Sequence, residues 1–118
     1  MGRNAKVAGR GSLLARAASI AGRRESLLVV DLADLYRATG RETDAERILR
    51  DAIFRSPDAA AARHALGLGL IRQKRYDEAV EQLELAAEYA ADEPRYAYVV
   101  CVAFLLMRSS ARLASQSA

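Results

Sequence analysis

Apolar residues recur every three to four positions along most of this chain, which is the spacing of one face of an α-helix. Segments with this spacing stand between turn signals, and they predict five helices over residues 26–39, 43–55, 59–73, 77–90 and 94–107. A weaker pattern predicts a further short helix near 12–22, with one face formed by Leu13, Ala17, Ile20 and Ala21. We therefore expect an all-α fold without strands.

The predicted helices are bounded by residues that commonly begin or end helices. Gly40 lacks a Cβ atom and so permits the left-handed backbone conformation that ends many helices. Thr43 and Glu46 have the spacing of a capping box, in which each side chain satisfies a free backbone N–H at the helix start. Asp77 is expected to cap the fourth helix, and Pro94 to open the fifth without losing a hydrogen bond.

The chain matches itself when it is shifted by 34 residues. Three sets of equivalent positions carry similar residues: Leu32, Leu66 and Val100; Ala33, Gly67 and Cys101; and Ala45 and Ala79. Two antiparallel helices approach to ~8–10 Å only where the side chains at their crossing are small. The second and third sets are therefore expected to mark helix crossings within each 34-residue unit.

A 34-residue period with this order of large and small residues resembles the tetratricopeptide repeat. The first unit reads Val29-x2-Leu32-Ala33-x2-Tyr36, then Ala45-x3-Leu49, then Ala52 and Pro57. The second reads Arg63-x2-Leu66-Gly67-x2-Leu70, then Lys74-Arg75-Tyr76-Asp77-Glu78-Ala79, then Leu83 and Ala86. Neither the family's Trp nor the second closing Pro is present, and Lys74 stands where Gly is usual at a turn.

This resemblance implies antiparallel helix–turn–helix repeats, a tetratricopeptide-like α-solenoid of about two and a half units. The units cover residues 26–59, 60–93 and, as a first helix only, 94–107. A basic segment, 1–25, precedes them, and a small polar tail, 108–118, is expected to be frayed. The chain could also be one part of a longer repeat array.

The resemblance further implies that the first helices of successive units line a concave groove that binds a peptide or protein segment. The family's spacing places in this groove Val30, Asp31, Asp34, Arg37, Ala38, His64, Ala65, Leu68, Ile71, Arg72, Arg95, Tyr98, Val99 and Val102. The groove is thus apolar with charges of both signs. Relatives that bind chaperone tails clamp a terminal carboxylate with Lys, Asn and Arg, and here only Arg95 suits that role, while Asp34 would repel the ligand.

Composition and charge limit the classes of function that the sequence supports. Hydrophobic residues make up 52% of the chain with no Trp, so the core is expected to consist of Ala, Leu and Val. Residues 1–25 carry a net charge of +5, residues 26–93 carry −5 and residues 94–118 carry +3. An acidic middle disfavours nucleic-acid binding by the repeats, although the basic first segment could still bind an anionic surface or a nucleic acid.

No group of residues points to catalysis. His64 has no Cys or His at metal-ligand spacing, and Cys101 stands where a small core residue is expected. We therefore expect no enzyme activity, cofactor or metal. The longest apolar run, Ala97 to Met107, is shorter than the ~18 residues of a membrane span. With no targeting signal recognised, a cytoplasmic protein without membrane contact is expected.

The leading interpretation is a protein-interaction module or adaptor, and its partner cannot be read from the sequence. An alternative is a structural role, in which the repeats assemble an oligomer. Residues 98–107 are apolar on every side of the expected helix, which predicts burial all round. We therefore expect a homodimer in which the last helix self-associates through Phe104, Leu105 and Met107.

Overall fold

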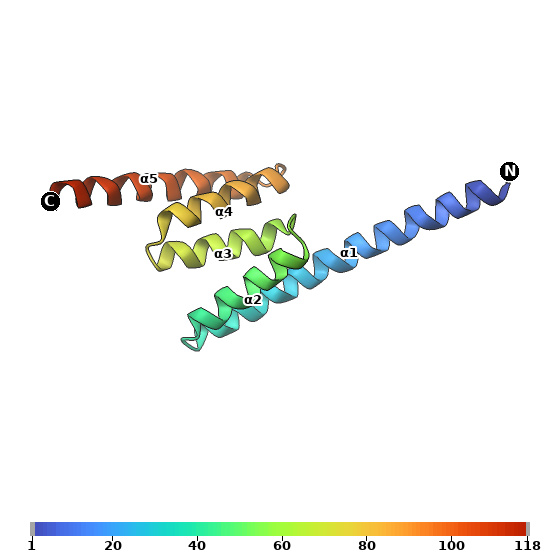
Figure 1. The fold of residues 1–118 in the computed structure, drawn as a ribbon, viewed down its shortest axis with the longest axis horizontal. Coiled ribbons are helices and arrows are strands. Elements are labelled where there is room, and N and C mark those ends of the chain that lie inside the picture. Colours follow the sequence, from blue (N-terminus) through green and yellow to red (C-terminus); the bar gives the residue numbers. More distant parts are fainter. Residues whose placement is uncertain (1, 118) are drawn as a thin grey trace.

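The computed structural model describes the backbone of residues 2–117 and the side chains of residues 13–116, apart from Ser19. The described chain is helical throughout and contains no strand. Its five helices are α1 (Gly2–Ala38), α2 (Glu42–Arg55), α3 (Ala60–Arg72), α4 (Tyr76–Tyr89) and α5 (Pro94–Ser117). Successive helices pack as antiparallel neighbours, as Figure 1 shows. The all-α prediction is confirmed.

The first helix is much longer than predicted. The segments 12–22 and 26–39 were expected to be separate helices, but both belong to α1, which runs unbroken from residue 2. No proline interrupts this stretch, and a glycine inside a helix costs only ~1 kcal/mol. At the expected break, the Ser26 hydroxyl donates a hydrogen bond to the Gly22 carbonyl (3.0 Å) one turn earlier.

The last helix is also longer than predicted. The tail 108–118 was expected to be frayed, but α5 continues through it to Ser117. Residues 108–117 lack Gly and Pro, and their Ala, Arg, Leu and Gln residues favour a helix. Because both terminal helices project beyond the stack (Figure 1), the molecule measures 73 × 29 × 20 Å.

The length of α5 also corrects the expectation about membrane spans. Among the described residues, Pro94–Gln116 is long and apolar enough to cross a membrane, judged by length and composition alone. Its most apolar window has a mean hydropathy of 1.5 and is only 6% buried. Counting consecutive apolar residues missed this helix because Arg108 ends the apolar run, whereas a mean over the whole window tolerates one or two charges.

The helix starts differ from the predicted caps. The capping box is wrong: α2 begins at Glu42 after Arg41, and no side chain caps its free N–H groups. Asp77 likewise lies inside the first turn of α4, which begins at Tyr76. In both units an Arg precedes the helix and pairs with the acid three residues later: Arg41 with Asp44 (2.8 Å) and Arg75 with Glu78 (2.9 Å). The acids remain favourable there because they face the positive end of the helix dipole.

The turns after the first helices agree with the sequence. Gly40 has the predicted left-handed conformation, with φ of 78°. Lys74, which stands at the equivalent position of the second unit, adopts the same conformation with φ of 62°. The turn is therefore repeated although the second unit has no glycine.

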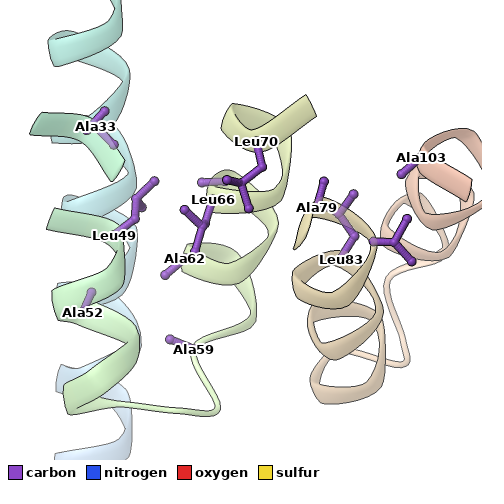
Figure 2. Close-up of a cluster of buried hydrophobic side chains, with 13 residues drawn as sticks. Ala33, Leu49, Ala52, Ala59, Ala62, Leu66, Leu70, Ala79, Leu83 and Ala103 are labelled. Carbon is purple, nitrogen blue, oxygen red and sulfur yellow. The ribbon is translucent and has the colours of Figure 1, made fainter. Parts of the chain in front are cut away.

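The core consists of small and aliphatic side chains between the helices, as Figure 2 shows. The expected crossing positions Ala33, Ala45 and Ala79 are buried. At Gly67 a Cβ atom would lie 2.5 Å from Cγ of Leu83, so the Leu83 side chain of α4 packs directly on the α3 backbone at this position. Small residues at these positions allow the paired helices to pack closely.

Each first helix has two faces that can pack on a neighbouring helix, which we call the back face and the front face. Where the neighbour is present, the back face packs on the second helix of the preceding unit and the front face on the second helix of its own unit. By the 34-residue register, the back faces are Leu28, Leu32 and Leu35 of α1; Ala62, Leu66 and Gly69 of α3; and Tyr96, Val100 and Ala103 of α5. The front faces are Val29, Ala33 and Tyr36; Arg63, Gly67 and Leu70; and Ala97, Cys101 and Phe104.

Only α3 has both faces covered, by α2 and by α4. In α1 the back face is open, so Leu32 is 43% exposed although the equivalent Leu66 is buried. In α5 the back face lies on α4, with Tyr96 and Ala103 buried, whereas all three residues of the front face are exposed.

Candidate peptide-binding groove

A strip of four predicted groove residues lies along one face of α3. His64, Leu68, Ile71 and Arg72 are spaced four, three and one residues apart, which places them on the same side of the helix. The first three are half-buried and Arg72 is exposed. The strip therefore offers two aliphatic side chains between a ring at one end and a cation at the other.

At one end of the strip, charged side chains of α1, α2 and α3 come together. Arg37 forms an ion pair with Asp34 on α1, and Arg72 lies 3.6 Å from the Glu42 carboxylate. Burial lowers the pKa of Arg37, the positive charge of Arg72 lowers it further, and Glu42 opposes the shift. These four residues form a charged cluster with both signs present.

At the other end of the strip, His64 meets the first turn of α5. Its ring stacks on Tyr96 with centroids 4.2 Å apart, and its Nδ1 atom is buried without a hydrogen-bond partner. Burial lowers the pKa of His64, and the nearby Arg95 lowers it further. The Arg95 guanidinium itself lies 5.6 Å above the Tyr96 ring and 3.8 Å from Glu93.

The remaining predicted groove residues differ in exposure. Asp31, Asp34, Arg95 and Tyr98 are exposed, as a binding surface requires. Val30 and Val99 are half-buried against the core, as Ile71 is. Ala65 was assigned to the groove but is buried in the core, and the Arg37 side chain, also assigned to the groove, is only 19% exposed. Neighbouring helices cover these two because α1 and α3 pack directly against each other.

Two residues at the ends of the strip were missed in the sequence. Tyr96 stands 34 residues after Ala62, a fully buried residue, so the repeat register contained the signal that it would pack inward. Glu42 was missed because its pairing with Arg72 joins α2 to α3, and no periodicity within one helix reports such a pair.

Comparison with known families agrees with this architecture. The family model described as Tetratricopeptide repeat matches residues 36–100, more than half of the chain. The chain belongs to the tetratricopeptide repeat family. Members are generally protein-interaction modules and typically non-catalytic. A search of curated proteins found no match.

Within the part of the tetratricopeptide chain that the structure describes, no group of three or more His, Cys, Asp or Glu residues could hold a metal ion. The polar side chains at the ends of the strip are instead Arg37 and Arg72 at one end and His64, stacked on the Tyr96 ring, at the other. Such groups suit contacts with a polypeptide, through hydrogen bonds from guanidinium groups and stacking on the rings.

Proposed function

We propose that this tetratricopeptide chain is an interaction module or adaptor that binds a peptide or protein segment in the groove of α1, α3 and α5. The observation that carries the proposal is the α3 strip, where Leu68 and Ile71 lie between His64 and Arg72. Aliphatic side chains that are partly open to solvent give apolar anchors a place to bind, and the flanking charges orient the ligand.

The charges indicate the character of the ligand. Asp31 and Asp34 stand on α1, while Arg72 and Arg95 stand beyond the apolar part of the strip. A polyanion would be repelled by the two aspartates. We therefore infer an amphipathic segment, with apolar side chains toward Leu68 and acidic side chains toward the two arginines.

The test uses a peptide selected from a random phage-displayed library on the purified chain, with affinity measured by fluorescence anisotropy. Arg72→Glu and Arg95→Glu should each weaken binding roughly tenfold, which is typical for a charge contact at a rim. Neither should lower the melting temperature greatly, because both side chains form exposed ion pairs and the further contact of Arg95 with the Tyr96 ring is long, at 5.6 Å. Glu81→Lys, on the exposed side of α4, is the matched control. Binding lost in the control and kept in both arginine variants would place the peptide elsewhere.

A second candidate function concerns the basic segment 1–25. Its net charge is +5, and the helix that carries it projects away from the repeats (Figure 1). This arrangement favours contact with an anionic surface or a nucleic acid. Retention on immobilised RNA or DNA that falls with salt, and is lost when Arg16, Arg23 and Arg24 are changed to Gln, would support it. Equal retention of that variant would contradict it.

A further inference from the structure

The open front face of α5 is equivalent, by the 34-residue register, to the covered front faces of α1 and α3. On α1 and α3 the equivalent faces are covered by an antiparallel helix, so that Ala33 and Leu70 have no exposed area. On α5, Cys101 is exposed and Phe104 is 45% exposed. The face thus carries the residues that pair helices in this fold, without such a helix among the described residues.

Neighbouring residues extend this face along the helix. Ala97, Cys101, Phe104, Arg108 and Arg112 are spaced by four, three, four and four residues, which forms one stripe, and Leu105 lies beside it with 60% exposure. The centre of the stripe is apolar and one end is basic. An exposed apolar stripe on a small domain generally marks an interface.

We propose that this face binds the same face of a second copy, as an antiparallel, two-fold pair of α5 helices that cross at Cys101. Cys101 is equivalent to Ala33 and Gly67, the small residues that are buried between paired helices within the chain. A small residue at the crossing lets the two backbones come near, and a two-fold axis closes the assembly as a dimer.

Charge complementarity favours a second copy over another helix. In an antiparallel pair that crosses at residue 101, Arg108 lies opposite position 94, where α5 of the other copy begins. The exposed acids Asp92 and Glu93 lie in the turn before that position and outnumber Arg95, which follows it, whereas residues 94–118 contain no acid. The basic end of each α5 helix therefore meets the acidic turn of its partner, and parallel pairing would bring like charges together.

A membrane is the other environment that an apolar helix could enter, and the charges disfavour it. The uncharged part of α5 between Arg95 and Arg108 has twelve residues, 96–107, which extend over roughly 18 Å. The hydrocarbon layer is about 30 Å thick. Insertion would also remove Tyr96 and Ala103, both buried, from their packing on α4.

Sedimentation equilibrium at micromolar concentration tests the pairing. The unchanged chain should sediment as a dimer, and Phe104→Glu or Leu105→Glu should raise the dissociation constant at least roughly tenfold. Leu28→Glu is the matched control, since Leu28 is an equally exposed residue on the open face of α1. A monomeric unchanged chain, or a dimer that only Leu28→Glu disrupts, would overturn the proposal.

Oxidative cross-linking tests the register of the pair. Two Cys residues form a disulfide when their Cα atoms are about 4.4–6.8 Å apart, so Cys101 should give a covalent dimer with diamide. In a Cys101→Ala background, Ser109→Cys lies eight residues beyond the crossing point, so its two copies would be roughly 24 Å apart along an antiparallel pair and should cross-link much less. Equal cross-linking of the two would overturn the crossing point. Flotation with phosphatidylcholine–phosphatidylglycerol vesicles, lost in Phe104→Glu and accompanied by a monomer in solution, would assign the face to a membrane instead.

Discussion

Helices α3 and α5 occupy equivalent places in successive repeats, yet their surroundings differ. On α3 the back face packs on α2 and the front face on α4, so that Leu66, Gly67 and Leu70 are buried. On α5 the back face packs on α4 and the front face is open. The residue types at equivalent positions therefore indicate that a helix can pack on another helix. Whether its side chains are buried depends on the presence of that second helix.

Equivalent residues on α3 and α5 also contribute differently to the stability of the folded chain. A fully buried aliphatic side chain contributes roughly 1.5–3 kcal/mol relative to an exposed one. Leu70 makes that contribution within the chain, since it has no exposed area. Phe104, at the equivalent position, keeps much of its surface in solvent and can contribute fully only when a second molecule covers it.

The largest expected difference is between Leu70→Ala and Phe104→Ala, each made in the monomeric Leu105→Glu background. Leu70→Ala should lower the free energy of unfolding by about 2–5 kcal/mol, because it leaves a cavity in the core. Phe104→Ala should cost much less, because water already reaches the ring. Urea titrations measure both. Equal costs would mean that the front face of α5 is covered within a single chain.

The next difference concerns the small residues at the helix crossings. Gly67→Leu and Ala79→Leu should each destabilise the chain by ~1–3 kcal/mol, because added atoms must displace the buried Leu83 or separate two helices. Cys101→Leu, at the position equivalent to Gly67 but exposed, should be nearly neutral in the same monomeric background. Thermal melts rank the three variants.

Arg63→Leu is the control for the repeat register. Arg63 stands where the family pattern has a large apolar residue, and it donates hydrogen bonds to the Pro57 carbonyl (2.7 Å) and to Gln82 (2.9 Å). Their loss should cost about 1 kcal/mol, and the apolar replacement offsets part of it. A greater loss for Arg63→Leu than for Gly67→Leu would show that the register is wrong.

Smaller changes in stability, of opposite sign, are expected at the equivalent positions 74 and 108. Lys74 has a left-handed backbone, which is unfavourable for a residue with a Cβ atom, so Lys74→Gly should stabilise the chain by about 0.5–1 kcal/mol. Arg108 is the equivalent residue on α5, but it lies inside the helix. Arg108→Gly should therefore cost ~1 kcal/mol. Chemical denaturation checks both signs, and matching signs would contradict the assigned conformations.

The sequence predicted the middle of the fold well and its ends poorly. Between Glu42 and Tyr89, apolar periodicity and turn residues placed three helices within about one residue of their observed bounds. The helix after Arg108 was missed because residue preference alone does not decide whether a helix ends. Lys74 and Arg108 are both long cations at the same position of the repeat. Only Lys74 is followed by an amphipathic segment, whose apolar side can pack back on the preceding helix when the chain turns.

Only the groove residues that lie on one helix could be brought together from the sequence. Helical spacing correctly brings His64, Leu68, Ile71 and Arg72 to one side of α3. The stacking of His64 on Tyr96 and the pairing of Arg72 with Glu42 depend on how neighbouring helices are placed. Contacts of that kind follow from tertiary packing, which no pattern along the chain specifies.

The smallest expected effect lies where α3 and α5 meet, at His64. Burial and Arg95 lower the pKa of His64 in the folded chain, whereas the unfolded chain keeps a pKa of about 6.5. As pH falls through that value, the unfolded state binds a proton that the folded state resists, so stability declines until the folded pKa is reached. Well above pH 6.5 both states are neutral at His64, and it contributes no pH dependence.

Urea midpoints at pH 7.5 and 5.5 measure this decline, and His64→Gln should reduce it. The carboxylates with lowered pKa, Asp44 and Glu46, lose their stabilising effect as pH falls through their ordinary pKa values of 3.8 and 4.5 toward the lower folded values, so most of that loss lies below this window. Arg95→Gln is the second variant, because removing its positive charge should reduce the decline without removing the ring. An unchanged decline in His64→Gln would show that the contact between α3 and α5 does not keep the histidine neutral.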